Sequence, residues 1–225
     1  MGAETPKQFL ELDGVPVLIF TLRRLAACAD IADFVIATRA EEVESIAVRV
    51  AKENLGRPVR VVRGGDTRQD SVANSLPEVP TDTDLILVHD AVRPLVTREQ
   101  IERVIAEALS CDAAILGVPA METVKEVKRA ALQGGAGDVA LITATIPRER
   151  VVLAQTPQVF RASLLLEAFA KARQDGVSAS DEAGLVERMG RDVHVVVGSE
   201  RNLKITRPGD MQLAEFYLRE ERAAR

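Results

Sequence analysis

The sequence predicts an α/β fold built around an open, mostly parallel β-sheet. Short apolar runs rich in β-branched residues alternate along the chain with longer stretches whose apolar residues recur at helical spacing. One run, Leu85–Val88, is apolar at every position, which is typical of a parallel strand covered on both faces. The length of 225 residues is about one and a half times that of an average domain, so we expect a single domain over 1–225 with an appendage.

The alternating runs define the elements of this fold in order. Ahead of the first helix, Leu12–Leu18 reads as a short hairpin. The strands are predicted at Phe34–Thr38, Val59–Val62, Leu85–Val88, Ala113–Val118 and Val193–Val197. The helices are predicted at Val17–Ala29, Glu41–Asn54, Arg68–Leu76, Arg98–Ser110, Ala162–Arg173, Glu182–Met189 and Met211–Arg222.

The segment from Thr123 to Gln155 breaks this rhythm. Val124–Lys128 alternates at period two, Gln133–Asp138 is a cluster of turn residues, and Val139–Ile142 follows as a second strand. We interpret the segment, residues 123–155, as a projecting β-hairpin arm. Because an isolated two-stranded ribbon is marginally stable, we expect the arm to pack on a second copy of the chain in a homodimer. The alternative is a hairpin folded back onto its own domain.

Composition and charge exclude several classes of function. Lys and Arg number 29 against 34 Asp and Glu, a net charge of −5. That is too acidic for a general nucleic-acid binder, although a local basic pocket can still hold a phosphorylated small molecule. Six Phe and one Tyr are too few for the stacking platforms of single-strand binders. No apolar run approaches the ~20 residues that cross a bilayer, so we expect a cytoplasmic protein without a membrane partner.

The cysteines and histidines do not suggest a metal centre. Cys28 and Cys111 lie far apart among apolar neighbours, which supports neither a disulfide nor a CxxC site and fits a reducing compartment. His89 and His194 cannot build a three-histidine zinc site, and the positions of the cysteines argue against a mixed one. Nucleophilic catalysis by a Cys–His pair stays open, but it has no local signature.

A glycine loop follows one of the predicted strands. Ligands of open α/β sheets bind outside the carboxyl ends of the strands, so the residues after each apolar run are candidates. After Val59–Val62 comes Gly64–Asp66, where the glycines let a ligand approach the backbone and the next helix offers its N-terminal amides to an anion. The alternative is a simple turn in which Thr67 and Asp70 form a capping box.

A second candidate loop follows Leu85–Val88 and begins His89-Asp90-Ala91-Val92-Arg93. An aspartate at the tip of a buried strand is placed to hold Mg²⁺ or a ribose hydroxyl, and Arg93 can grip a phosphate. The alternative is a turn in which Asp90 and Arg93 pair with each other. His89 is a candidate general base, but we favour a histidine whose hydrogen bonds are satisfied by the turn.

Two lysines complete the set of candidates. Lys7 precedes the first hairpin, and Lys204 lies in an alternating segment whose apolar side carries Leu203 and Ile205. At both positions an ordinary solvated lysine is the alternative. Several cations brought together would suit phosphoryl transfer, in which catalysis is mostly positioning and charge stabilisation.

Six short motifs span these candidates. They are Pro6–Phe9, Gly64–Val72, Val88–Pro94, Ala154–Phe160, Ser180–Ala183 and Asn202–Pro208. In this order, across essentially the whole chain, they resemble the motifs of the 2-C-methyl-D-erythritol 4-phosphate cytidylyltransferase family. The resemblance implies a Rossmann-like nucleotidyltransferase of the nucleotide-diphospho-sugar transferase type, with a mixed, mostly parallel sheet and a β-arm exchanged within a homodimer.

The resemblance also implies a reaction. CTP would donate its cytidylyl group to 2-C-methyl-D-erythritol 4-phosphate with Mg²⁺ present, releasing pyrophosphate in non-mevalonate isoprenoid biosynthesis. The substrate phosphate would attack the α-phosphorus in line. No covalent enzyme intermediate is needed, in agreement with the absence of a nucleophile signature.

Matching motif positions assign roles to individual residues. Lys7 would stabilise charge on the α-phosphate, Lys204 would orient the attacking phosphate, and Arg148 would position the substrate from the other subunit's arm; these three are the predicted catalytic residues. The other assignments are Gly65, Asp66, Ser71, Asp90 and Ala91 for the nucleotide, Arg93, Thr123, Arg148 and Ser180 for the acceptor, and Asp90 for the metal.

The N-terminus departs from the family pattern. Members begin with an apolar strand and a glycine-rich, arginine-containing loop, whereas Met1–Glu4 matches only the end of that loop. We therefore expect a true start upstream of Met1 and poor activity of the 225-residue chain. Two other functions stay open. One is ribitol 5-phosphate cytidylyltransferase, against which Thr123 and Arg148 argue, and the other is an inactive nucleotide-binding or dimerisation module.

Overall fold

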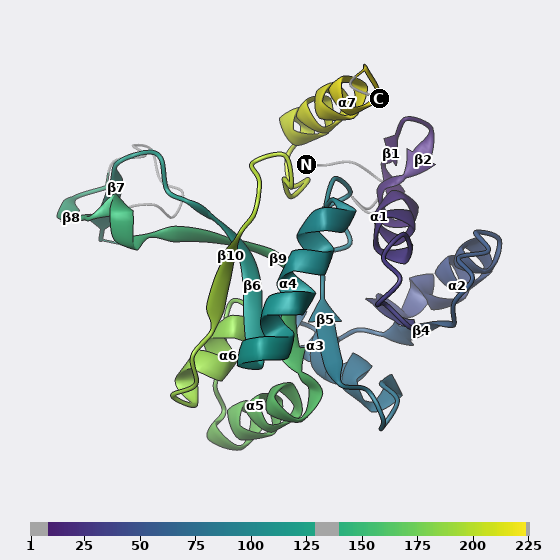
Figure 1. Ribbon diagram of the computed structural model, residues 1–225, viewed down its shortest axis with the longest axis horizontal. Helices are drawn as coiled ribbons and strands as arrows, with labels where there is room; N and C mark the ends of the chain where they lie inside the picture. Colours follow the sequence, from purple (N-terminus) through teal and green to yellow (C-terminus); the bar gives the residue numbers. More distant parts are fainter. Residues whose placement is uncertain (1–8, 129–139, 224–225) are drawn as a thin grey trace.

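The computed structural model describes residues 9–128 and 140–223 and confirms the α/β prediction. Its larger sheet has four strands in the order β10-β6-β9-β5 (Figure 1). Strand β9 runs antiparallel to both neighbours, whereas β6 and β10 are parallel, so the sheet is mixed and three of its strands point the same way. The four strands are β5 (Leu85–Val88), β6 (Ala113–Pro119), β9 (Val152–Arg161) and β10 (His194–Val197).

A second, parallel pair is formed by β3 (Phe34–Thr38) and β4 (Val59–Arg63). The 3-10 helix η2 (Ala40–Glu42) and helix α2 (Val43–Ala51) lie between these two strands in the chain. Within the described residues no strand pairing joins this pair to the larger sheet. The carboxyl ends of β3, β4 and β5 nevertheless come together, because one cleft is lined by the residues that follow all three strands.

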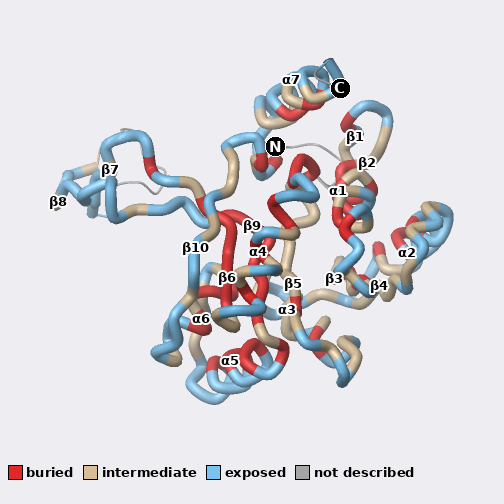
Figure 2. The backbone as a smooth tube through the Cα atoms, viewed as in Figure 1, coloured by how far each residue is buried: buried red, intermediate tan, exposed pale blue. Residues whose placement is uncertain are grey.

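Strand β6 shows why the predicted strands are apolar throughout. Its Ala114 and Leu116 belong to one core cluster with residues of α1 and α4, while Ala113 and Ile115 belong to a second cluster with residues of α5 and α6. Strand β6 and the C-terminal half of β9 are therefore buried on both faces of the sheet (Figure 2), whereas the edge strand β10 is mostly exposed. The helices are α1 (Val17–Ala26), α3 (Arg68–Ser75, followed by the 3-10 helix η3, Leu76–Glu78), α4 (Arg98–Cys111), α5 (Ala162–Asp175) and α6 (Glu182–Arg188).

Strand β9 is the element that the sequence pattern misses. Pro157 and three polar residues, Gln155, Thr156 and Gln158, interrupt the apolar pattern that predicts a buried strand. In the structure all three polar side chains are buried and hydrogen-bonded. The predicted arm, 123–155, overlaps this strand at its C-terminal end, where Val152–Ala154 pair with β6.

The predicted hairpin is present as β7 (Val124–Val127) and β8 (Ile142–Ile146), which pair antiparallel in a sheet of their own. Figure 1 shows it projecting away from the larger sheet. Its second strand is Ile142–Ile146, whereas the sequence pattern predicted this strand at Val139–Ile142, too close to the N-terminus. The predicted turn, Gln133–Asp138, lies outside the described residues.

Both ends of the described chain meet in a third core cluster. The predicted first hairpin is β1 (Glu11–Leu12) and β2 (Val15–Pro16), joined by Asp13 and Gly14 with φ of 55° and 72°. Helix α7 (Pro208–Ala223) packs near it, and the cluster comprises Leu12, Val17, Leu95, Ile205, Ala214 and Leu218. Among the helices of the described residues, none combines the length and apolarity that a membrane span requires.

Candidate active site

A cleft of about 430 Å³ opens at the carboxyl ends of β3, β4 and β5. It lies where the topology of an open α/β sheet predicts a ligand. Four of the predicted nucleotide-binding residues, Gly65, Asp66, Ser71 and Ala91, line it. The structure therefore gathers these four residues from the loop after β4, the first turn of α3 and the loop after β5.

Close packing explains the two glycines after β4. The Gly64 N–H donates to the Thr38 carbonyl oxygen at 2.7 Å, and the Gly65 N–H donates to Ser71 Oγ at 3.1 Å. A Cβ on Gly65 would lie 2.2 Å from Asp70 Cβ, and a Cβ on Gly64 would lie 2.8 Å from Ser71 Oγ. A side chain at Gly65 would therefore collide with the first turn of α3, and the loop backbone stays open to the cleft.

The capping box considered for this segment is also present. Thr67 Oγ1 accepts from the Asp70 N–H at 3.0 Å, and Asp70 Oδ2 accepts from the Thr67 N–H at 3.2 Å. Asp66 makes no hydrogen bond or ion pair with the described residues, and it lines the cleft. One carboxylate thus caps the helix and the other is available to a ligand, so capping and ligand binding coexist.

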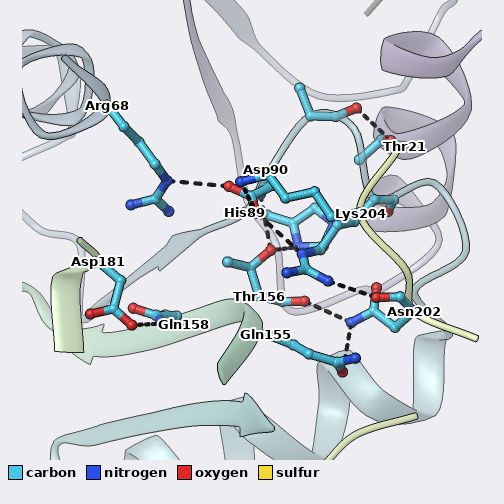
Figure 3. Close-up of polar contacts among 12 residues, drawn as sticks. Thr21, Arg68, His89, Asp90, Gln155, Thr156, Gln158, Asp181, Asn202 and Lys204 are labelled. Carbon is cyan, nitrogen blue, oxygen red and sulfur yellow. Dashed lines mark hydrogen bonds and ion pairs between the residues drawn. The ribbon is translucent and has the colours of Figure 1, made fainter. Parts of the chain in front are cut away.

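Asp90 is the centre of a charged network beside this cleft (Figure 3). Its Oδ1 lies 3.2 Å from Arg68 Nε, and its Oδ2 lies 3.1 Å from both Arg93 Nε and Lys204 Nζ. Burial alone would raise the pKa of Asp90, but the charges of Lys204, Arg68 and Arg93 outweigh it and lower the pKa to about 2. With Glu182, described below, these residues form what we call the Asp90 network.

The turn pairing considered for Arg93 is confirmed, within this larger network. Arg93 is nearly enclosed, and its Nη1 donates to the Asn202 carbonyl oxygen at 2.8 Å. The Ile205 N–H donates to the Val92 carbonyl oxygen at 2.9 Å, which docks the C-terminal segment against the turn. The Lys204 side chain is 40% exposed, so its ammonium group can meet a ligand while it stays paired.

His89 is held as a neutral, structural histidine. Its Nε2 lies 3.1 Å from the Arg93 carbonyl oxygen and its Nδ1 lies 3.0 Å from Thr156 Oγ1. A carbonyl can only accept, so Nε2 carries the proton and Nδ1 accepts from the hydroxyl. Burial lowers the pKa of His89 to about 4. Both ring nitrogens are occupied, so the interpretation of a histidine satisfied by the turn holds and that of a general base has no support in this geometry.

Arg68 and Glu182 belong to the network although they were not predicted as site residues. Arg68 Nη1 donates to both Glu182 carboxylate oxygens, at 2.7 and 2.9 Å, and the Glu182 side chain is only 1% exposed. Burial raises the pKa of Glu182 although Arg68 acts in the opposite direction. Arg68 therefore ties the start of α6 to Asp90. The signal was available, since both residues lie inside the motifs that carry the family resemblance.

The polar side chains of β9 hold the loops on either side of the network. Asn202 Nδ2 donates to the Thr156 carbonyl oxygen at 2.8 Å, and Gln155 Nε2 donates to the Ser199 carbonyl oxygen at 2.8 Å. On the other side, Gln158 Nε2 donates to Asp181 Oδ2 at 2.8 Å (Figure 3). Buried polar groups need such partners, which explains why this strand departs from the apolar pattern.

The remaining predicted residues lie elsewhere. Thr123 and Arg148 are exposed at the base of the arm, where Arg148 Nη1 donates to the Met121 carbonyl oxygen at 2.8 Å and η5 (Arg148–Arg150) begins. Neither makes a hydrogen bond or ion pair with the Asp90 network within the described residues. Ser180 is exposed next to Asp181, the N-cap of α6. Lys7 lies outside the described residues.

Two arginines that were not predicted also line the cleft. Arg39 follows β3 and Arg63 ends β4. Both are exposed, and within the described residues neither forms an ion pair. The rule that located the other candidates, inspection of the residues that end each strand, would have found them. They add positive charge to a cleft already flanked by Lys204, as a polyphosphate ligand requires.

A magnesium ion at Asp90 would require a rearrangement of this network. Mg²⁺ demands near-octahedral oxygen ligands at about 2.0–2.1 Å, whereas both Asp90 oxygens are paired with cations. An ion held here would displace at least one of those cations and take most of its ligands from bound phosphates and water. Magnesium, with Asp90 as its ligand, therefore stays a prediction, and no step below depends on it.

Comparison with known proteins agrees with the family resemblance of the sequence motifs. A family model for 2-C-methyl-D-erythritol 4-phosphate cytidylyltransferase matches residues 1–220. The protein of that name from Acidobacterium capsulatum is 53% identical over 216 residues, covering 96% of this chain and 88% of that protein.

Solved structures match over nearly the whole chain. The 4-diphosphocytidyl-2C-methyl-D-erythritol synthase of Anaerococcus prevotii has a TM-score of 0.83 at 27% identity, covering 94% of this chain and 93% of that one. The 2-C-methyl-D-erythritol 4-phosphate cytidylyltransferase of Thermus thermophilus has a TM-score of 0.76 at 34% identity, covering 96% and 95%. These similarities confirm the predicted nucleotidyltransferase fold. The chain belongs to the 2-C-methyl-D-erythritol 4-phosphate cytidylyltransferase family.

Proposed function

We propose that this chain transfers the cytidylyl group of CTP to 2-C-methyl-D-erythritol 4-phosphate. The products are pyrophosphate and 4-diphosphocytidyl-2-C-methyl-D-erythritol, in non-mevalonate isoprenoid biosynthesis. The observation that carries the proposal is the Asp90 network, with its exposed Lys204, beside a cleft lined by Gly65, Asp66 and Ser71. Family membership supplies the identity of the two substrates.

The reaction needs positioning and charge stabilisation rather than a protein nucleophile. An oxygen of the acceptor phosphate attacks the α-phosphorus of CTP and forms the new P–O bond. The bond from the α-phosphorus to the bridging oxygen breaks, and its electron pair leaves with pyrophosphate. Negative charge builds on the phosphoryl oxygens throughout, so fixed cations lower the barrier. The satisfied, neutral state of His89 agrees with a reaction that asks no base of it.

Lys204 is the cation best placed to meet the attacking phosphate. The Asp90 carboxylate fixes its ammonium group at 3.1 Å, and 40% of the side chain is exposed. Arg93 is only 11% exposed, so its main effect is to hold the turn while its guanidinium contributes charge from behind. We expect Lys7, by its motif position, to stabilise the α-phosphate.

The cleft supplies polar groups for a base and a ribose. We propose that Asp66, Ser71 and the backbone of Gly65 read the edge of cytosine, and that Asp90 and Ala91 contact the ribose. Asp66 has no partner among the described residues and lines the cleft, which supports its role. Polar edge contacts can replace stacking, as a chain with seven aromatic residues requires.

We propose that the arm completes the site of a second copy of the chain. Thr123 and Arg148 would contact the acceptor there, and Ser180 would contact it from its own subunit. In support, apolar side chains are exposed on the arm at Leu141 and Ile142, and on the larger sheet in a set comprising Leu153, Val195 and Val197. Burying such residues against a second copy would remove apolar surface from water. Light scattering of the purified chain tests the dimer.

Two further proposals concern conditions. We propose that Mg²⁺ accompanies CTP, held mainly by phosphates, so excess EDTA should abolish transfer. We also propose a cytoplasmic location, supported by the two free cysteines, Cys28 and Cys111.

A titration with CTP followed by a pyrophosphate-release assay tests the proposed function. We expect CTP to bind and pyrophosphate to appear, at a low rate, with 2-C-methyl-D-erythritol 4-phosphate as the acceptor. Release with ribitol 5-phosphate alone would identify the other acceptor. Binding of CTP without release for either acceptor would identify an inactive module. The Acidobacterium capsulatum relative is the positive control.

A further inference from the structure

A group of metal-binding side chains lies at the opposite end of the sheet from the cleft. Glu107 and Cys111 are one helical turn apart at the end of α4, and His194 begins β10. The candidate ligand atoms all lie within 4.8 Å of one another. His194 is paired with Ala114 at the start of the parallel strand β6, whereas the cleft lies at the carboxyl ends of β3, β4 and β5. The group is therefore separate from the Asp90 network.

The geometry of the three groups is already close to convergent. His194 Nδ1 lies 2.6 Å from Glu107 Oε1, and Cys111 Sγ lies within 4.8 Å of a ligand atom of each of these residues. The Cys111 thiol donates to the backbone carbonyl oxygens of Glu107 and Ala113 at 3.1 and 3.2 Å, and metal binding would replace these contacts. Adjacent ligand atoms of a tetrahedral zinc ion are about 3.3–3.8 Å apart, given bonds of about 2.0–2.3 Å. The His194 and Glu107 side chains are 50% and 39% exposed, so small rotations can bring both oxygen and nitrogen to a common ion.

The donor set selects the metal. A thiolate, an imidazole and a carboxylate are ligands that Zn²⁺ accepts together, whereas Mg²⁺ and Ca²⁺ prefer oxygen alone. Among the described residues this is the one group of three or more such side chains close enough to hold an ion. Two of the ligands come from α4 and the third from β10, which lie side by side (Figure 1).

We propose that Glu107, Cys111 and His194 form a zinc site with a water molecule as the fourth ligand. Binding releases the thiol proton of Cys111 to solvent as the Zn–S bond forms, and water fills the remaining position. The ion joins α4 to β10, the edge strand that pairs only with β6 in the described residues. No part of the group lines the cleft, so we assign the ion no step in cytidylyl transfer. The sequence argued against a mixed site because of the positions of Cys28 and Cys111. The parallel β6–β10 pairing brings His194 to the end of α4, where Cys111 lies.

Cobalt substitution tests the site on the full chain. We titrate the purified protein with Co²⁺ alone and record the near-ultraviolet charge-transfer band that a cobalt–thiolate bond produces. We expect one Co²⁺ per chain with this band, displaced by Zn²⁺. Zinc at a hundredfold excess over its Kd should raise Tm by about 5 °C or more.

Matched variants locate the ligands. We expect Cys111→Ser to lose the charge-transfer band and the thermal shift, and His194→Asn to weaken binding about tenfold or more. The control Cys28→Ala changes the other cysteine, which is buried among apolar residues, and should keep the band. Unchanged cytidylyl transfer in Cys111→Ser would separate this site from the reaction. Absence of the band in the parent chain, or its persistence in Cys111→Ser, would overturn the proposal.

Discussion

The Asp90 network and the base of the arm both carry residues assigned to phosphate binding, but they are built in opposite ways. In the network, Arg68, Arg93 and Lys204 all lie within 3.2 Å of the Asp90 carboxylate. At the base of the arm, Thr123 and Arg148 are exposed. Arg148 makes a hydrogen bond there, to the Met121 carbonyl oxygen.

The difference indicates which part of the site one chain can preorganise. Fixed and partly desolvated charges cost no reorganisation when charge develops in the transition state. The charges of the Asp90 network are fixed within one chain, because residues of β5, β9, α3, α6 and the C-terminal segment hold them in place. Arg148, exposed on a two-stranded arm, is not fixed in this way. This agrees with the proposal that a second copy of the chain packs against the arm. The two regions should therefore respond differently to mutation.

The largest expected effect is on Lys204. Lys204→Ala should lower turnover on the order of a hundredfold or more, because it removes a cation from the point where charge develops. Stability should change little, because Asp90 keeps Arg68 and Arg93 as partners. Pyrophosphate release measures the rate, and urea unfolding checks the fold. Lys171→Ala, which alters an exposed lysine of α5, is the control. Near-normal turnover of Lys204→Ala would refute its assigned role.

Arg68 should affect the stability of the fold. Arg68→Ala leaves the Glu182 carboxylate buried without its cationic partner, and losing one member of a buried pair costs about 3–5 kcal/mol. We expect the lower end of that range, about 3 kcal/mol in the free energy of unfolding, because Arg68 is 33% exposed. Urea denaturation measures the loss. The double variant Arg68→Ala/Glu182→Gln removes the stranded charge and should recover part of it; no recovery would mean that Arg68 acts mainly through Asp90.

The sequence anticipated the strands and helices better than this network. Runs such as Leu85–Val88 and Ala113–Val118 could be predicted because burial on both faces requires apolar residues throughout. Strand β9 could not, because Gln155, Thr156 and Gln158 are buried for their hydrogen bonds rather than for their apolar surface.

The site residues also divide into those that a local pattern could predict and those that it could not. Gly65, Asp66, Ser71 and Ala91 could be found from their positions after strands, and the structure brings them to one cleft. The pairing of Arg68 with Glu182 joins residues 114 positions apart, a contact that no local pattern encodes. The motifs could have named both residues, but only the tertiary packing shows that they pair.

The pH dependence of stability should report the enclosure of His89. Its pKa is lowered to about 4 in the folded chain, against about 6.5 when unfolded. As the pH falls below about 6.5, His89 binds a proton in the unfolded state but not in the folded state. The free energy of unfolding therefore falls, and it levels off below about pH 4. The loss should reach about 3 kcal/mol. Urea midpoints between about pH 7 and 4 measure it, and His89→Gln should flatten the curve over this range. An equally steep curve in that variant would assign the loss to other groups.

The smallest single-variant effect is expected at the arm. Arg148→Ala should raise KM for the acceptor about tenfold while leaving stability and CTP binding unchanged, because it removes an exposed guanidinium and one hydrogen bond to a carbonyl. Arg150→Ala, in the same 3-10 helix, is the matched control. A large loss of stability in Arg148→Ala would show that Arg148 supports the arm itself rather than the substrate.

Mixing two impaired variants distinguishes an arm that acts on its own subunit from one that acts across a dimer. In a mixed dimer of Lys204→Ala and Arg148→Ala, a site that combines the intact Lys204 of one chain with the intact Arg148 of the other is complete only if the arm reaches across. Random exchange then restores roughly a quarter of the sites, seen at low acceptor concentration as activity above the roughly one tenth that Arg148→Ala alone retains. If the arm serves its own subunit, every site lacks one cation, and the mixture shows no more activity than the two variants measured separately.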